Sequence, residues 1–387
     1  MLRRIYNIAL RECRIAWSMP IYRFCILVFP IIVVIYFTSL MHEGVPENMP
    51  IGVVDLDRTT FTRGVIRQLD AMQTSQVVSY YNSVSEARDA IQKNKIFAFI
   101  YFPEGCTADI TASRQPTISV YYTETVLVAG SMTYRDLKTA CSLAAAKVGT
   151  TKLAALGKSS EEIKAFLQPI ALDLHLVNNP WLNYNIYLST YAVPGVLMIF
   201  IFLLVPYSIW TEVKFNRSRE WMQMAGGNVA VALIGKLLPH TLMFLAILLG
   251  FEFYIYGYLD FPHEGGIVPI LVAGVLSVLA CQGFGVFVSS FIPSLRMSMS
   301  ICALWSVVSF STCGATYPVT AMHPMIHGMS ILFPLRHYIV IYQQCIFDGF
   351  PLSYVWINIG CLLLFTILPI FTGRLIKKSM TKPVYIP

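Results

Sequence analysis

The sequence predicts an α-helical polytopic membrane protein of six transmembrane helices, with an extracytoplasmic α/β domain inserted between spans 1 and 2. Its 387 residues are 56% hydrophobic and 13% charged, whereas a soluble domain has about 25% charged residues. Several uncharged runs are long enough to cross a bilayer. Residues 42–184 instead alternate strand-like and helix-like segments. These observations divide the chain into 1–41, 42–184 and 185–387.

Residues 24–41 form the first uncharged run, eighteen residues long. At about 1.5 Å per residue, a helix of this length covers most of a ~30 Å hydrocarbon core. The run exceeds the ~7–15 apolar residues of a signal peptide, and Ser39-Leu40-Met41 offers no small-x-small cleavage site, so we expect an uncleaved anchor. Five arginines precede the run and predict a cytoplasmic N-terminus: Arg3, Arg4, Arg11, Arg14 and Arg23.

Residues 2–18 have helical periodicity. Leu2, Ile5, Ala9 and Cys13 fall on one face, and the arginines fall on the other. The pattern favours an interfacial helix on the cytoplasmic surface, but it equally suits a polar lead-in to the first span.

Residues 42–184 predict one α/β domain with a mixed sheet, because strand-like runs alternate with helical ones. A long helix is expected over 126–156, and a further helix is expected to be capped by Ser159 or Ser160. The sequence leaves open whether Cys106 and Cys141 form a disulfide. The expected strands are 51–55, 77–81, 96–102 and 118–122, and the expected intervening helices are 61–72 and 85–94.

The formal charge of +7 does not indicate a nucleic-acid partner. Residues 42–184 hold 13 of the 28 Lys and Arg and 14 of the 21 Asp and Glu, so the basic excess lies beside the predicted spans. Membrane orientation and anionic lipid headgroups explain it there.

Five further spans complete the prediction. Basic residues follow span 2 and occur again in the C-terminal tail, whereas loop 258–266 has no Lys or Arg. Because basic residues favour the cytoplasmic side, both termini are expected in the cytoplasm. The expected spans are 185–210, 233–256, 267–292, 297–317 and 353–372.

Residues 318–351 contain an apolar stretch that Pro334, Arg336 and His337 interrupt. If this stretch crossed the membrane completely, the basic C-terminal tail would lie on the outer side instead of in the cytoplasm. We therefore predict a re-entrant segment on the outer side, where an irregular backbone must be buried in protein or face water.

Two further features are candidate sites. Glu252 falls near the outer end of span 3, where a carboxylate either forms a functional polar site or simply reaches water. His323 and His327 lack a third ligand, so no metal site is expected.

At two places the chain resembles a known family. These are loop 211–228, which reads TEVKFNRSREWMQMAGGN, and the proline-bearing region 316–349. With these residues the chain resembles the type V, or type-2, ABC exporter permeases, the transmembrane subunits of drug- and lipid-efflux transporters. Family members usually have Arg-Glu followed by Gly-Thr in this loop. Here Arg219-Glu220 match, and Trp221-Met222 stand in place of Gly-Thr.

The resemblance implies that this loop is a coupling helix that sits in a cleft of an ATPase subunit. Its charges would orient that contact, and its apolar residues would fill the cleft. The implied coupling residues are Glu212, Lys214, Arg219, Glu220, Trp221 and Met222. The implied gate in the outer segment includes Pro324, Pro334 and Arg336.

The chain itself is not expected to be an enzyme or to hold a cofactor. Gly235-Lys236 is its nearest approach to a phosphate loop, but Ala230 and Leu237 occupy positions that the motif reserves for Gly and for Ser or Thr. ATP and Mg would therefore bind the partner ATPase subunit.

The remaining expectations concern partners and cargo. A second permease subunit would complete a homodimer or heterodimer in the bacterial inner membrane. The use of a periplasmic adaptor and an outer-membrane channel stays open. Hydrophobic or amphipathic cargo, drug-like or lipid-like, suits the apolar spans. The alternative is a membrane-anchored sensor whose outer domain binds a ligand, although the chain offers no cytoplasmic output domain.

Overall fold

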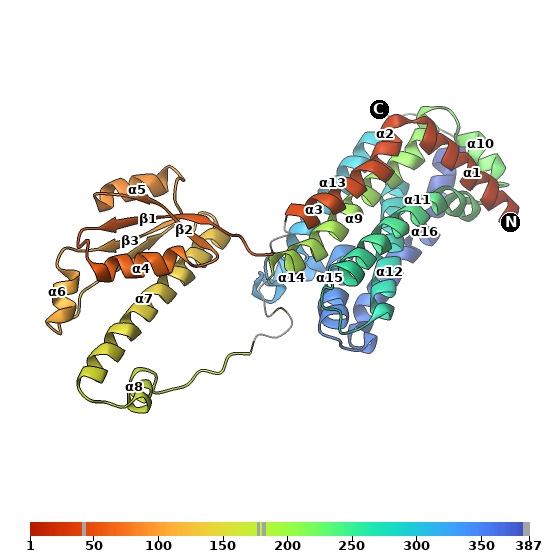
Figure 1. Ribbon diagram of the computed structural model, residues 1–387. Coiled ribbons are helices and arrows are strands. Elements are labelled where there is room, and N and C mark those ends of the chain that lie inside the picture. The colour runs from red at the N-terminus through yellow and green to blue at the C-terminus, as the bar shows by residue number, and fades with distance from the viewer. Residues whose placement is uncertain (41–43, 176–178, 180–182, 382–387) are drawn as a thin grey trace. The chain divides into compact units, whose positions relative to one another are not determined.

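The computed structural model describes all residues except 41–43, 176–178, 180–182 and 382–387. The chain forms two compact units (Figure 1). We call Glu43–Leu176 the sheet unit, and Met1–His42 with Val177–Pro387 the membrane unit. The sheet unit lies within the predicted range 42–184. Residue 41, where the first span was expected to end, is outside the described residues.

The sheet unit contains a four-stranded sheet with the order β2-β1-β3-β4. Strand β1 pairs in parallel with β2 and β3, and β4 is antiparallel to β3. Each strand overlaps one of the strand-like runs. The strands are β1 (Met49–Asp55), β2 (Ser75–Tyr80), β3 (Ala98–Phe102) and β4 (Ser119–Tyr122).

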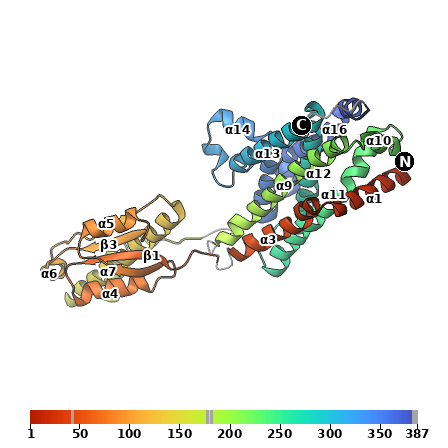
Figure 2. The same cartoon turned by 90° about the horizontal axis from the view of Figure 1, so that it is seen from above.

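Helices cover both faces of this sheet. Helices α4 and α7 pack on one face and α5 packs on the other (Figure 2). The side chains alternate between the two cores, so Val53 faces α4 and α7 while Val54 faces α5. Ser159 caps α8 in a capping box with Glu162. The helices are α4 (Thr60–Asp70), α5 (Val84–Gln92), α6 (Cys106–Thr111), α7 (Leu127–Ala155) and α8 (Ser160–Leu167). Cys106 and Cys141 are free thiols.

The membrane unit is a bundle of long apolar helices. Asn183, Asn228 and Ser294 cap the first turns of α9, α11 and α13 with their side-chain oxygens. The elements are α1 (Leu2–Ser18), α2 (Pro20–Arg23), η1 (Phe24–Val28), α3 (Phe29–Leu40), α9 (Tyr184–Lys214), α10 (Ser218–Met224), α11 (Val229–Phe253), η2 (Tyr254–Tyr258), α12 (Ile267–Phe291), α13 (Leu295–Thr312), η3 (Val319–Ala321), α14 (Pro324–Ser330), α15 (Pro334–Ile341), η4 (Tyr342–Phe347), η5 (Leu352–Val355) and α16 (Trp356–Thr381).

Five helical segments in the described part of the chain are long and apolar enough to cross a membrane. They are Pro20–Leu40, Tyr184–Lys214, Val229–Tyr258, Ile267–Phe291 and Leu352–Thr381. Helix α13, in the place of the predicted fifth span, is 18 residues long and is not among them. It is shorter than the predicted 297–317 because the helix ends before Gly314, whose φ is +96°. The count of six spans therefore stays a prediction.

Helix α1 has the predicted length, and residues outside the predicted apolar face pack into the membrane unit. Leu2 and Cys13 are exposed, whereas Ile8 and Glu12 are buried. Ile8 packs against α11 at Gly235, where an added Cβ would lie 2.8 Å from the Ile8 Cβ. The helix is turned this way because Arg11 and Glu12 find ion partners inside the membrane unit.

Candidate functional site

Four charged side chains from three helices form a connected cluster inside the membrane unit. We call Arg11, Glu12, Glu212 and Lys236 the ion cluster. Both guanidinium terminal nitrogens of Arg11 donate to the Glu212 carboxylate at 2.8 Å. The Lys236 ammonium donates to Glu212 at 2.7 Å and to Glu12 at 2.6 Å. Helices α1, α9 and α11 are thereby joined.

The ion cluster is buried and electrically balanced. The side chains of Glu12, Glu212 and Lys236 are at most 2% exposed, and that of Arg11 is 13% exposed. A buried charge is costly unless it is paired and hydrogen-bonded, and the bidentate Arg11–Glu212 contact is the strong geometry for such a pair. Two positive and two negative side chains therefore hold one another in place.

Tyr22 and His240 extend the cluster. The Tyr22 hydroxyl lies 3.2 Å from a Glu12 carboxylate oxygen and 2.7 Å from His240 Nε2. An ionised carboxylate only accepts, so Tyr22 donates its proton to Glu12 and accepts from His240 Nε2–H. Among the described residues His240 Nδ1 then has no hydrogen-bond partner.

The short helix α10 is anchored beside the ion cluster by Trp221. This side chain is fully buried, and its indole N–H donates to the Ala232 carbonyl at 3.3 Å. The Lys236 ammonium lies 5.1 Å from the centre of the ring, a cation–π distance. Met222 is also buried. Helix α10 is therefore fixed to the start of α11.

This placement corrects part of the predicted coupling surface. Trp221 and Met222 fill the interior of this chain, so they offer no surface to a partner. Glu212 is likewise enclosed by Arg11 and Lys236. Trp221 and Met222 turn inward because α10 is amphipathic and lies against α11 and α16, which supply an apolar surface.

Helix α1 also contacts the end of α10. Gly226 and Gly227 both have positive φ, which ends the helix in the conformation that glycine tolerates best. The Arg4 guanidinium lies over Gly226, where an added Cβ would come within 2.2 Å of Arg4 Nη1. Figure 1 and Figure 2 both show α1 beside α10.

The exposed part of loop 211–228 contains Lys214, Arg219 and Glu220 and, in addition, Phe215. The Phe215 side chain is 48% exposed, and Lys214 and Arg217 lie 5.7 and 5.0 Å from its ring centre. Phe215 was not among the predicted coupling residues. Its position could have indicated a contact surface, because it is an aromatic residue between basic residues in a short loop.

The ion cluster was not predicted either, although one signal for it is present in the sequence. Lys236 and His240 are ionisable residues within a predicted span, which by itself indicates a functional or structural polar site. Lys236 follows Gly235 in the incomplete phosphate-loop motif. Its actual partners are Glu12 and Glu212.

Segment 318–351 contains the largely exposed helix α14 and is largely buried in the bundle from Phe333 through α15. It follows α13, and at its turn the Phe333 ring lies 4.9 Å from the Trp305 ring. Trp305 is seven residues before the end of α13, or about 10 Å along the helix. Helices α15 and η4 then return to the end of the bundle from which α12 starts, where Gly265 N–H donates to the Ile346 carbonyl at 3.2 Å.

The three predicted gate residues have different environments. Pro324 starts α14 and is exposed, whereas Pro334 starts α15 and is buried. Proline suits this first helical position because no N–H is needed there. Arg336 donates to the Cys313 carbonyl at 3.2 Å and so ties α15 to the end of α13.

Near the end of η4, a cavity of about 530 Å³ is lined by aromatic and polar side chains. Tyr187, Tyr191 and Tyr342 line it together with Gln343 and Gln344. The Tyr187 hydroxyl donates to the Ala315 carbonyl at 2.6 Å. The cavity therefore lies between the start of α9 and the returning segment.

Glu252 is buried in the membrane unit and does not reach the surface, with an exposed fraction of 2%. Tyr338 on α15 donates to one carboxylate oxygen at 3.4 Å. In the described structure the other oxygen has no hydrogen-bond partner. Gly274 on α12 leaves room for it, since a Cβ there would lie 3.3 Å away. The interpretation that Glu252 simply reaches water is therefore wrong.

A comparison with family models matches residues 20–373 to the family described as ABC-2 family transporter protein. No curated protein matches the chain. The matched range contains the ion cluster's Glu212 and Lys236, loop 211–228, segment 318–351 and the sheet unit. This chain, a multi-pass membrane protein, belongs to the ABC-2 transporter family.

Proposed function

We propose that this chain is the permease subunit of an exporter that moves hydrophobic or amphipathic molecules, drug-like or lipid-like, out of the cell. A separate ATPase subunit that binds ATP and Mg drives it, and a second permease subunit completes the transport pathway. Membership of the ABC-2 family supports a permease that works with an ATPase subunit. The direction and cargo are our proposal, and they rest on the resemblance and on the apolar composition of the spans.

The observation that carries the coupling mechanism is the attachment of both ends of loop 211–228 to one ion cluster. Glu212 lies near the end of α9, and Lys236 lies in the second turn of α11. Arg11 and Glu12 hold both of them to α1. A displacement of α10 would therefore move α1, α9 and α11 together, because the buried pairs resist separation.

The ATPase subunit would contact the exposed side of this assembly. Phe215 offers an apolar anchor, and Lys214, Arg219 and Glu220 offer charges around it. Interfaces concentrate their binding energy in such central aromatic residues, while rim charges guide association. Trp221 acts indirectly, by keeping α10 fixed to α11.

We propose that the chain crosses a bacterial inner membrane six times, with α13 as the fifth span. Both termini lie in the cytoplasm, and the sheet unit lies on the outer side of the membrane. Segment 318–351 then dips into the membrane from the outer side and closes the pathway. Pro324, Pro334 and Arg336 shape this segment, and Glu252 is a polar site beside it.

The test is reconstitution of the full chain with the ATPase subunit that copurifies with it. Phe215→Ala should lower copurification and transport-coupled ATPase activity at least tenfold, because a central anchor is lost. Phe350→Ala is the matched control, since Phe350 is also 48% exposed but follows η4 at the other end of the bundle. Equal effects of the two substitutions, or wild-type coupling in Phe215→Ala, would contradict the proposed contact.

A further inference from the structure

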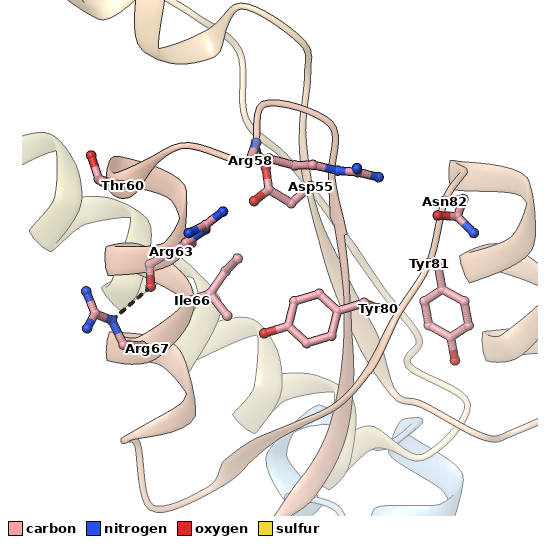
Figure 3. Close-up of a pocket in the computed structure, with 9 residues that line it drawn as sticks. All are labelled: Asp55, Arg58, Thr60, Arg63, Ile66, Arg67, Tyr80, Tyr81 and Asn82. Carbon is pink, nitrogen blue, oxygen red and sulfur yellow. Dashed lines mark hydrogen bonds between the residues drawn. The ribbon is translucent and has the colours of Figure 1, made fainter.

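The sheet unit has an open cavity of about 650 Å³ between helix α4 and strand β2 (Figure 3). Its walls come from the loop after β1, one side of α4 and the end of β2. The cavity lies at the carboxyl ends of two parallel strands, where α/β sheets commonly bind ligands. The lining residues are Asp55, Arg58, Thr60, Arg63, Ile66, Arg67, Tyr80, Tyr81 and Asn82.

Three arginines line this cavity and make it basic. Among the described residues, none of Arg58, Arg63 and Arg67 forms an ion pair. The Arg67 Nε–H donates to the Arg63 carbonyl one turn earlier, at 3.4 Å. Arg58 and Arg63 thus keep the donors of their guanidinium groups available, and this planar group suits carboxylate, sulfonate or phosphate oxygens.

Among the described residues of the lining, the one acidic side chain is already engaged. Asp55 accepts the backbone N–H groups of Asp57 and Arg58 at 3.2 and 2.9 Å, and the Thr62 hydroxyl at 2.9 Å. These bonds turn its carboxylate toward the start of α4. Asp55 therefore organises the loop and leaves the arginines unpaired.

The remaining walls are suited to an aromatic group. Figure 3 shows the Arg63 side chain and the Tyr80 ring pointing into the space between α4 and β2, with Ile66 between them. Tyr80 is 68% exposed, so its ring can stack on a ligand without displacing protein atoms. Cationic and aromatic surfaces thus face the same volume.

We infer that this cavity binds an amphipathic organic anion, a carboxylate, sulfonate or phosphate attached to an aromatic body. Arg58 and Arg63 hold the anionic group, and the exposed Tyr80 ring contacts the aromatic part. This ligand site lies in the sheet unit and does not depend on the proposed coupling through loop 211–228.

The test uses the full chain in phosphatidylcholine nanodiscs and calorimetric titration, with empty nanodiscs as the blank. The probes are 2-naphthoate and 1-naphthyl phosphate, with 2-naphthamide as the uncharged match and inorganic phosphate as the anion alone. The two naphthyl anions should bind at least tenfold more tightly than 2-naphthamide and inorganic phosphate, because each of these lacks one half of the contact.

Substitutions locate the binding. Arg63→Gln and Arg58→Gln should each weaken 2-naphthoate binding about tenfold, which is typical for the loss of a charged hydrogen bond. Tyr80→Ala should weaken it less, about threefold. The control is Arg88→Gln, an equally basic and exposed site on α5, across the sheet. Hydrogen exchange in β1 verifies that each variant keeps its fold.

Several results would overturn the inference. These are no binding of either naphthyl anion to the wild-type chain, equal binding of 2-naphthamide, or an Arg88→Gln loss as large as that of Arg63→Gln. Inorganic phosphate binding as tightly as naphthyl phosphate would also overturn it, because the aromatic surface would then contribute nothing.

Discussion

The Lys236 ammonium lies 2.6 Å from a carboxylate oxygen of Glu12, a residue 224 positions earlier in the chain. This contact joins the N-terminal helix α1 to α11 inside the membrane unit. Since Lys236 also binds Glu212 at 2.7 Å, one lysine connects the N-terminal helix with both helices that flank loop 211–228.

Lys236→Met should lower the free energy of unfolding by about 3–5 kcal/mol, because Glu12 would stay buried without its cation. The double variant Glu12→Gln/Lys236→Met should recover part of this loss, since Arg11 still pairs with Glu212. Unfolding midpoints in mixed micelles measure both changes. A double variant no more stable than the single lysine variant would show that the buried charge is not the cause.

Trp221→Ala should destabilise the membrane unit by about 3–5 kcal/mol, the usual cost of truncating a buried tryptophan. Trp356→Ala is the control, because Trp356 is 68% exposed at the start of α16. Its unfolding midpoint should stay near the wild-type value. If Trp221→Ala left stability unchanged and only weakened ATPase binding, Trp221 would be a direct partner contact after all.

Gly265→Ala should disturb the contact between segment 318–351 and the connection to α12. An added Cβ would lie 1.7 Å from the Cys345 carbonyl oxygen, so the backbone must shift. The expected loss is about 1–3 kcal/mol of unfolding free energy. Gly250→Ala is the matched control, because a Cβ added at Gly250 on α11 would meet no atom within 4 Å. It should leave the unfolding midpoint unchanged or raise it slightly.

The sheet unit should lose stability in acid through Asp57. Burial opposes ionisation of this carboxyl, but hydrogen bonds from Thr107 and Thr59 outweigh it and hold the pKa of Asp57 below its ordinary value. A lowered folded-state pKa gives stability that is present above the unfolded pKa and disappears as pH falls through the folded one. The loss therefore begins near pH 4, the ordinary aspartate range, and continues below it.

Thr107→Val tests this pH dependence. Its stability deficit, measured by hydrogen exchange in the full chain corrected for intrinsic rates, should be largest near pH 7 and shrink below about pH 4. A deficit that is constant over this range would contradict the contribution of the Asp57 charge.

Topology can be measured by cysteine labelling in a background without accessible native thiols. A cysteine at Lys158, in the sheet unit, should react with an impermeant reagent added from outside. One at Lys377, exposed on the last turns of α16, should react only after permeabilisation. The opposite labelling pattern would contradict the proposed orientation.

The sheet unit was largely predictable because its signals are local. Strand periodicity gave β1 to β4 to within a few residues, and Ser159 does cap α8. The register irregularity after Ile51 was not predictable, because it depends on how Gly52 fits against Ile96 and Tyr81.

The site was less predictable because its contacts are distant in sequence. Arg11 and Glu212 are 201 residues apart, and no periodicity indicates that they pair. The sequence could not show, for a similar reason, whether the Trp221 side chain faces this chain or a partner subunit. An amphipathic loop helix gives the same pattern whether its apolar face meets a partner subunit or the same chain.

The ion cluster has a consequence for synthesis of the protein. A lysine near one end of an apolar helix makes membrane insertion less favourable, by up to about 3 kcal/mol if it lies at the centre. Glu12 and Glu212 both precede Lys236 in the chain, so they leave the ribosome first. The carboxylates that neutralise this lysine are therefore already available when α11 arrives at the translocon, and the order of translation itself supports insertion of this helix.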